Sequence, residues 1–323
     1  MRPLGSTGLS VSALALGGAP LGSMPENFGY EVPESRAVEL VRACLDSPVR
    51  TIDTSNGYSG GRSEQRIGAG IAAHGGLPAD VVVITKVDPR DGDYSGRRVR
   101  DSVEESRRRL GLERLPLVHL HDPEFHPWEV ITAPGGAVDA LVDLRESGAV
   151  GSIGVAGGHA ATVARYLDLG VFDAVLVHNR WTLVDRSAGE LIERAAARGV
   201  GVVNAAVYGG GMLARRDDAH DRGGSGDGAG PRYGYRPAHP ATVRAVARMR
   251  EVCARHGTDL ATAALQHSLR DGRIATTVVG LSRPGRLEEA VRAAGADLPD
   301  AFWQEVESLV PPREAWLDHQ DAA

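Results

Sequence analysis

Short apolar runs rich in β-branched residues recur along the chain, and an amphipathic segment follows each of them. Near-continuous apolar runs of this length are typical of strands that are buried on both faces in a parallel sheet. The runs that predict strands are 14–18, 50–54, 81–86, 115–121, 150–157, 173–179, 199–207 and 274–280. The pattern therefore predicts a parallel sheet covered by helices.

The segments between these runs carry Glu, Arg, Ala and Leu at helical spacing, and several end in glycine, as helix C-termini often do. Examples are "SRAVELVRACLD", "RRVRDSVEESRRRLG", "AVDALVDLRESG" and "AGELIERAAARG". The first strand is not followed by a Gly-x-Gly-x-x-Gly motif, which disfavours an open dinucleotide-binding sheet. The alternation over 323 residues instead favours a closed (β/α)8 TIM barrel, whose chemistry sits on the loops after the strands.

Two segments lie outside this repeat. The opening "RPLGSTGLSVSAL" predicts a β-hairpin that closes the N-terminal end of the barrel. Residues 214–237, after the seventh strand, form a long polar and Gly-rich loop, which either covers the active site or is a tolerated surface insertion. The whole chain, 1–323, is expected to be one barrel domain.

Composition narrows the class of partner. The formal net charge is -6, and acidic and basic residues are interleaved, which disfavours binding to nucleic acid or to a membrane surface. The apolar runs stay shorter than a membrane span and the N-terminus lacks a signal pattern, so a cytoplasmic protein is expected. Neither Cys44 nor Cys253 has a second thiol near it in the sequence, so no metal site is expected. The expected partner is a small molecule, with the chain a monomer or homo-oligomer.

Ionisable residues stand at the ends of successive predicted strands. Asp53 ends the second strand, Lys86 the third and His121 the fourth. Tyr58 lies on the loop that follows Asp53. Taken singly, such residues are usually N-caps, packed rings or solvated charges. Because the C-terminal ends of parallel strands meet at one mouth, we expect all four side chains to form one cluster.

This set of side chains suits proton transfer through a phenol. A free tyrosine has a pKa of about 10, and a neighbouring Lys86 ammonium would lower it by stabilising the phenolate. Asp53 would keep Lys86 protonated and in place, and His121 would hydrogen-bond the substrate oxygen. With no activated Ser or Cys in the set, the chemistry points to carbonyl–alcohol redox reactions, in which a cofactor supplies the hydride.

The sequence resembles the aldo-keto reductase family over essentially its whole length. The matching pieces are "LGSTGLSVSALALGGAPLG", "IDTSNGYSGGRSEQRIG", "ITKV" and "LVHLHD", in the family's order. The resemblance implies a (β/α)8 barrel, an NAD or NADP cofactor across its C-terminal mouth, and a catalytic tetrad of Asp53, Tyr58, Lys86 and His121. His119 is the alternative histidine, and His121 is preferred because the family's histidine ends the strand.

Further matches imply cofactor contacts. The segment "VVGLSRPGRLEEA", 278–290, resembles the one that binds the adenosine end of the cofactor, and "AAVYGGGML", 205–213, the one beside the pyrophosphate. A helix start, a hydroxyl and a guanidinium suit a phosphate, and Arg286 leans towards NADP. An N-cap role for Ser282 and a plain glycine turn at 209–211 stay open. The implied contacts are Tyr208, Gly209, Gly280, Ser282, Arg286 and Glu289.

Some positions depart from the family pattern. "GVAGG", 154–158, replaces a more usual Gly-Val-Ser-Asn, and His178 falls where a glutamine commonly holds the nicotinamide carboxamide. His178 is therefore a further expected cofactor contact. Ala205 stands where many members place an aromatic ring against the nicotinamide. The nicotinamide ring would then be held by Trp181 or Tyr208.

The motifs "ALGGAPLGSM" and "VLVHNRWTLVD" resemble the branch with L-fucose and D-threo-aldose 1-dehydrogenases and pyridoxal 4-dehydrogenase. That resemblance implies oxidation of an aldose's anomeric hydroxyl, or of a related hemiacetal such as pyridoxal, to a lactone, with Tyr58 taking the proton. Trp181, Tyr30 or Phe28 would contact the substrate. Two alternatives stay open: an NADPH-dependent reductase of an aldehyde or ketone, including a natural-product intermediate, and a nicotinamide-binding regulatory subunit.

Overall fold

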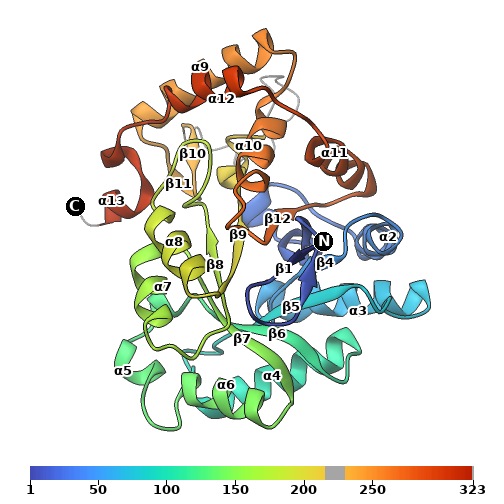
Figure 1. The fold of residues 1–323 in the computed structure, drawn as a ribbon. Coiled ribbons are helices and arrows are strands. Elements are labelled where there is room, and N and C mark those ends of the chain that lie inside the picture. The colour runs from blue at the N-terminus through green and yellow to red at the C-terminus, as the bar shows by residue number, and fades with distance from the viewer. Residues whose placement is uncertain (215–229, 322–323) are drawn as a thin grey trace.

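The computed structural model describes residues 1–214 and 230–321, and its central feature is a closed barrel of parallel strands (Figure 1). Neighbours around the barrel follow chain order, and β12 pairs with both β3 and β9 to close the ring. The barrel strands are β3 Leu14–Gly17, β4 Thr51–Asp53, β5 Val82–Val87, β6 Leu115–His121, β7 Val150–Gly157, β8 Ala174–His178, β9 Gly201–Ala205 and β12 Thr276–Gly280. Each predicted strand overlaps one of them, so the TIM-barrel prediction is confirmed.

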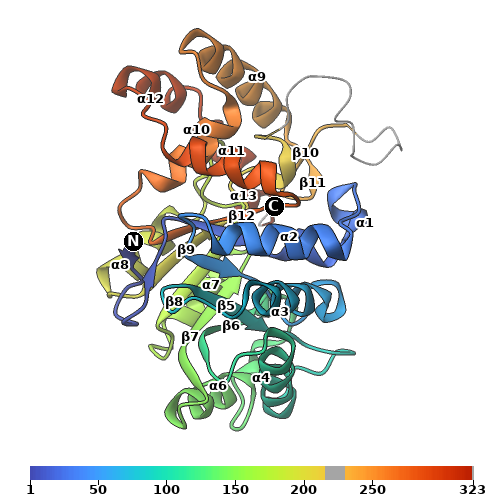
Figure 2. The ribbon, with the colours of Figure 1, turned by 90° about the vertical axis from the view of Figure 1, so that its right-hand side faces the viewer.

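A helix follows each barrel strand and packs on its outer surface (Figure 2). These helices are α2 Glu34–Leu45, α3 Arg62–His74, α4 Gly96–Leu110, α6 Ala137–Glu146, α7 Ala160–Leu167, α8 Gly189–Ala197, α10 Leu260–Leu269 and α11 Pro284–Ala294. The described residues also form α1 Pro25–Phe28, α5 Trp128–Ile131, α9 Pro240–Arg255, α12 Asp300–Glu307, α13 Leu317–Asp321 and the 3-10 turns η1 Ala19–Gly22, η2 Tyr58–Gly61, η3 Pro123–Phe125, η4 Gly209–Gly211 and η5 Arg313–Ala315. None of the described helices is both long and apolar enough to cross a membrane.

The barrel strands are apolar on both faces because both faces are covered. Val83 belongs to the cluster that strands share with the surrounding helices, whereas the next residue, Ile84, packs inside the barrel with Leu117 of β6. Successive side chains of a strand point to opposite faces, so one apolar run serves both layers. This accounts for the continuous runs seen in the sequence.

The N-terminal hairpin of β1 Arg2–Pro3 and β2 Ser10–Val11 closes one end of the barrel, as predicted. Leu4 and Val11 are fully buried among the inward-facing strand side chains. Gly5 has a φ of +54°, and a Cβ there would stand 2.3 Å from the backbone nitrogen of Gly201. The close approach therefore requires glycine. Figure 2 shows this hairpin at the end of the barrel opposite α1 and β10.

The segment 214–237 is only partly described, since residues 215–229 lie outside the described residues. Its last part is not an irregular loop as expected, but contains a short antiparallel pair, β10 Arg232–Tyr233 and β11 Arg236–Pro237. Tyr233 explains this, because its ring is buried and its hydroxyl lies 2.8 Å from the carbonyl oxygen of Asn179. Whether 215–229 covers the site stays a prediction.

Candidate active site

A cavity of about 2110 Å³ opens at the C-terminal ends of the barrel strands. All four residues of the predicted cluster line it: Asp53, Tyr58, Lys86 and His121. Asp53 is the last residue of β4 and His121 the last of β6. Lys86, which is the next-to-last residue of β5, lies between them. The structure thus brings together the residues that the sequence pattern grouped.

Lys86 and Asp53 form a buried ion pair beneath the phenol. The lysine Nζ donates to Asp53 Oδ1 over 2.7 Å and to the Thr54 carbonyl over 2.6 Å. Only 1% of the Lys86 side chain is exposed. Burial would lower the pKa of Lys86, but Asp53 and Tyr58 outweigh it, so that the pKa is raised. Lys86 is therefore an ammonium ion, and its Nζ lies 4.9 Å from the centroid of the Tyr58 ring.

Tyr58 is a protonated phenol at neutral pH. Burial raises its pKa above the usual range, and Lys86 lowers it in part, as expected from the sequence. The nearby carboxylates of Asp53 and Asp122 act with burial. Desolvation of the phenolate thus raises the pKa of Tyr58 by more than the Lys86 ammonium lowers it. The expected net lowering of this pKa is therefore wrong. A protonated phenol inside a cavity is a proton donor.

His121 is held through one of its two ring nitrogens, Nδ1. Its Nδ1 lies 2.6 Å from Asp88 Oδ1 and 3.2 Å from Ser55 Oγ. Its edge meets the Tyr58 ring, with centroids 5.6 Å apart. Burial would lower the pKa of His121, but Asp88 and Asp122 outweigh it and the pKa is raised. Because Asp88 accepts the Nδ1 proton, Nε2 is the nitrogen left to meet a substrate oxygen.

His119, the alternative histidine, lies one step deeper on β6. It pairs with Gly154 of β7 and is fully buried. Among the described residues neither of its ring nitrogens has a hydrogen-bond partner. Burial, with help from Lys86 and His121, lowers its pKa well below the usual range. His119 is therefore a neutral core residue under the site, and the polar contacts belong to His121.

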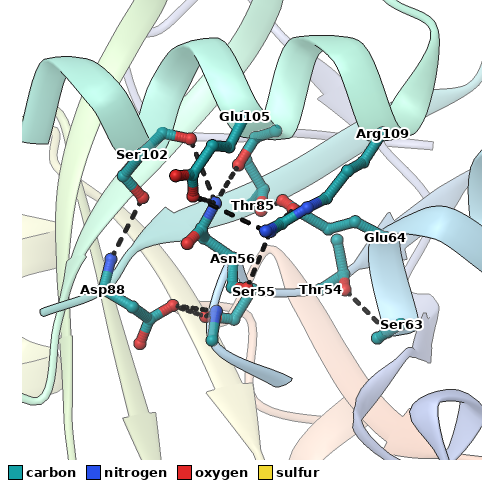
Figure 3. Close-up of polar contacts among 12 residues, drawn as sticks. Thr54, Ser55, Asn56, Ser63, Glu64, Thr85, Asp88, Ser102, Glu105 and Arg109 are labelled. Carbon is teal, nitrogen blue, oxygen red and sulfur yellow. Dashed lines mark hydrogen bonds and ion pairs between the residues drawn. The ribbon is translucent and has the colours of Figure 1, made fainter. Parts of the chain in front are cut away.

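Asp88 links the histidine to the loop that carries Tyr58. Figure 3 shows its contact with Ser55 of this loop. Its Oδ2 accepts from the Gly57 N–H over 2.6 Å and from the Ser55 hydroxyl, while its Oδ1 holds His121. The histidine, in turn, lowers the pKa of Asp88 despite burial. Sequence reasoning missed Asp88. The available signal was its position two residues after Lys86, at the same strand end.

Asn56 fixes the same loop to α4, as Figure 3 shows. Its Nδ2 donates to the Ser102 carbonyl over 3.1 Å and to Glu105 Oε2 over 3.2 Å. Arg109 Nη1 donates to the Asn56 carbonyl over 3.1 Å. Hydrogen bonds from Arg98 lower the pKa of Glu105 to about 2. The short bridge between Asp53 and Tyr58 is thus held by buried polar contacts on its outer side.

Most of the predicted cofactor contacts line the same cavity: His178, Tyr208, Gly280, Ser282, Arg286 and Glu289. Arg286 Nη1 lies 2.9 Å from Glu289 Oε2 in a half-exposed pair. Ser282 does not cap the following helix, because α11 begins at Pro284 and its N-cap residue is Arg283. The N-cap interpretation of Ser282 is therefore wrong, and its hydroxyl stays a candidate phosphate contact.

Two residues that were expected to contact the cofactor or the substrate, Gly209 and Trp181, lie outside the main cavity. Gly209 packs beneath Tyr233, where a Cβ would stand 2.3 Å from the ring, while Gly210 and Gly211 line the cavity instead. Trp181 faces a separate small pocket and packs against His267, with ring centroids 5.6 Å apart. Tyr30 and Phe28, the other expected substrate contacts, do line the main cavity.

The lining of the cavity includes small residues and a guanidinium that suit a nicotinamide dinucleotide. Gly17, Ala205 and Gly280 leave strand ends without bulky side chains. Gly158 also lines the cavity and packs closely against His178, since a Cβ there would stand 2.5 Å from the His178 ring. At the far part of the same cavity, Arg286 offers a guanidinium for a phosphate.

Barrel, cavity and buried cluster are together those of a TIM-barrel oxidoreductase. The chain belongs to the Aldo/keto reductase family, whose sequence model matches residues 13–311. Enzymes of this family use NAD(P)(H). The family assignment agrees with the resemblance read from the motifs.

Known relatives span nearly the whole chain. L-galactose dehydrogenase of Arabidopsis thaliana is 31% identical, covering 97% of this chain and 94% of its own. D-threo-aldose 1-dehydrogenase of a Pseudomonas species is 28% identical over 93% of this chain and 94% of its own. Pyridoxal 4-dehydrogenase of Microbacterium luteolum is 29% identical, with 95% and 96% covered.

Solved structures share the fold. An aldo-keto reductase from Bacillus halodurans, in its holo form, superimposes with a TM-score of 0.78 at 22% identity over 99% of this chain and 98% of that one. Glycerol dehydrogenase from Gluconobacter oxydans gives 0.70 at 21% identity, with 93% and 91% covered. At these identities the likeness concerns the barrel architecture.

Proposed function

We propose that this protein is an NAD(P)-dependent dehydrogenase that oxidises the anomeric hydroxyl of an aldose, or of a related cyclic hemiacetal such as that of pyridoxal, to a lactone. The observation that carries the proposal is Tyr58 held between the Lys86 ammonium and the His121 ring in one cavity. The names of the relatives support the substrate class, since two act on sugars and one on pyridoxal.

The roles follow from the contacts. In oxidation, the phenolate form of Tyr58 accepts the proton of the substrate hydroxyl, and Lys86 stabilises that form. His121, fixed by Asp88, orients the substrate oxygen through Nε2. A bound nicotinamide supplies the hydride acceptor, so the substrate loses a hydride and a proton. Asp53 keeps Lys86 charged and in place.

For the cofactor, we assign the adenosine end to Gly280, Ser282 and Arg286, with Glu289 orienting the guanidinium. His178 and Tyr208 are assigned to the nicotinamide end. A guanidinium suits the extra phosphate of NADP, so NADP is slightly favoured over NAD.

A reductase of aldehydes or ketones is the second candidate. It is favoured by the raised pKa of Tyr58, which keeps the phenol in the protonated form that reduction needs. The same residues serve both directions, and only turnover separates the two functions. A regulatory subunit would bind the cofactor tightly and show turnover with neither class of substrate.

The test is a substrate panel followed at the reduced-nicotinamide absorbance band. L-fucose, D-arabinose, L-galactose and pyridoxal are each offered with NAD and with NADP, and simple aldehydes with NADPH. We expect oxidation of at least one sugar or hemiacetal, and a loss of roughly 10²–10⁴-fold in Tyr58→Phe. Equal rates in Tyr58→Phe and the wild type on every substrate would contradict the mechanism.

A further inference from the structure

Asp122 is a carboxylate beside the reacting groups to which the mechanism above gives no role. It directly follows His121, lines the cavity, and has a side chain that is 34% exposed. Its Oδ2 lies 3.7 Å from His121 Nε2, which is too far for a hydrogen bond. Nε2 therefore remains open to a substrate, with an acceptor oxygen standing next to it.

The position of Asp122 is fixed by its neighbours. Its backbone N–H donates to the Ala156 carbonyl over 2.7 Å. Its φ is +44°, which is uncommon for a residue other than glycine. Oδ1 lies 3.6 Å from His178 Nε2, and among the described residues it is a buried oxygen without a hydrogen-bond partner. Oδ1 thus points to the protein, and Oδ2 is the oxygen beside Nε2.

The charge of Asp122 defines what it can bind. Burial would raise its pKa, but His121 and His178 outweigh it and hold the pKa below its usual range. Asp122 is therefore an ionised carboxylate, which accepts hydrogen bonds and donates none. A ligand that covers Oδ2 of Asp122 without giving it a hydrogen-bond donor would bury an unpaired charge, which is costly.

Substrate chemistry supplies the missing donor. When His121 Nε2 holds the oxygen of the reacting carbon, a hydroxyl on the next carbon is separated from that oxygen by one O–C–C–O unit. Such a hydroxyl reaches an acceptor that stands beside Nε2, as Asp122 Oδ2 does. An aldehyde without this hydroxyl leaves the carboxylate unpaired.

We propose that Asp122 is a specificity-determining residue that accepts a hydrogen bond from the hydroxyl next to the reacting carbon. The substrate class is then 2-hydroxy aldehydes and the cyclic hemiacetals of aldoses, in preference to plain aldehydes and to pyridoxal, whose carbon next to the reacting one carries no hydroxyl. This inference rests on the proposed function, because it uses the same cavity and the same reacting centre.

The test compares lactaldehyde with propanal, which differ by one hydroxyl, as substrates for reduction by NADPH. The readout is the ratio of the two kcat/KM values in the wild type, Asp122→Asn and Asp122→Gly. Both replacements tolerate a positive φ, so the backbone at this position is preserved. Asp101→Asn, an exposed aspartate of α4, is the matched control.

We expect the wild type to prefer lactaldehyde by roughly 100-fold or more, because a site built for a hydroxyl rejects the analogue without it. The preference should fall by at least about tenfold in Asp122→Asn and further in Asp122→Gly, and stay unchanged in Asp101→Asn. NADPH affinity, followed by quenching of protein fluorescence, should be the same in all four proteins.

Several results would overturn the inference. They are an absent preference in the wild type, an equal loss on both aldehydes in the variants, or a loss of NADPH affinity.

Asp122, Glu124 and His178 also bring ligand atoms within 4.8 Å of one another, so a preference that disappears after EDTA dialysis would assign recognition to a cation instead. If the wild type turns over neither these aldehydes nor any of the panel, the proposed function fails as well. Normal turnover with an unchanged ratio of the two kcat/KM values in the variants would overturn this inference and leave the proposed function in place.

Discussion

The two sides of the barrel mouth are built in different ways. On the polar side, β4 to β6, the strand ends carry the buried Asp53 and Lys86 and the half-buried His121, each held by further polar groups. On the small-residue side, β7, β9 and β12 end in Gly157, Ala205 and Gly280. We interpret the difference as a division of labour, in which one side would supply side-chain chemistry and the other space and backbone for a cofactor.

The largest expected effect comes from breaking the ion pair of the polar side. Lys86→Met should abolish most activity, by roughly 10²–10⁴-fold, because the phenolate loses its cation. It should also cost about 3–5 kcal/mol of unfolding free energy, since Asp53 is left as an unpaired buried charge. Urea unfolding and turnover measure the two effects.

The double variant Asp53→Asn with Lys86→Met separates the effect on activity from the effect on stability. It should recover most of the lost stability and none of the activity, because the buried charge is gone while the phenol still lacks its partner. Equal instability of the single and double variants would show that the pair does not act as described.

The next effect concerns pH and the orientation of His121. With Asp88 accepting the Nδ1 proton, Nε2 carries a proton only in the imidazolium form, so reduction should be lost as pH rises through the pKa of His121. Asp88→Asn removes a negative charge that raises this pKa. The loss should then begin at a pH lower by roughly one unit, and oxidation should be gained at a correspondingly lower pH.

The matched control is Asp91→Asn, an exposed residue of the same loop, which should leave both pH profiles in place. A profile in Asp88→Asn that stays unchanged, or that moves to higher pH, would remove His121 from the titrating step.

On the small-residue side, Gly158→Ala should weaken cofactor binding by roughly tenfold. The new Cβ would stand 2.5 Å from Cε1 of His178 and displace that ring. Gly285→Ala is the control, because its Cβ would meet open space. Titration of NADPH fluorescence compares the two, and equal affinities would refute a role for Gly158 and His178 in cofactor binding.

The smallest effect is expected at the edge of the cavity. Arg286→Ala breaks a half-exposed pair with Glu289, so stability should change by less than about 1 kcal/mol. NADP affinity should fall by up to about tenfold while NAD affinity stays the same, because the guanidinium serves the extra phosphate. An equal loss for both cofactors would place Arg286 at a part of the cofactor that the two share.

The sequence predicts the polar side well, for a physical reason. Asp53, Lys86 and His121 each interrupt the end of an apolar run, and the topology of a parallel barrel brings strand ends together. Asp88 also follows the end of β5, but the sequence does not assign it to His121 as a partner. Asp88 contacts it through one side-chain oxygen on a neighbouring strand end, and no periodicity marks that contact.

The small-residue side is harder to read because its contacts come from backbone and shape. Glycines 209 to 211 are alike in sequence, yet Gly209 packs under Tyr233 while the other two line the cavity. Trp181 follows the strand end like a substrate contact, but its ring packs against His267 outside the cavity. Such distinctions depend on the local backbone path and not on residue type.

Tyr58→Phe tests the division of labour most directly when cofactor affinity and hydride transfer are measured on the same protein. NADPH fluorescence gives the affinity, and a stopped-flow single turnover gives the rate. We predict an affinity within about twofold of the wild type and a rate lower by at least about 100-fold, because the phenol moves the proton and does not hold the cofactor. An unchanged rate, or a rate that falls only with the affinity, would contradict this account.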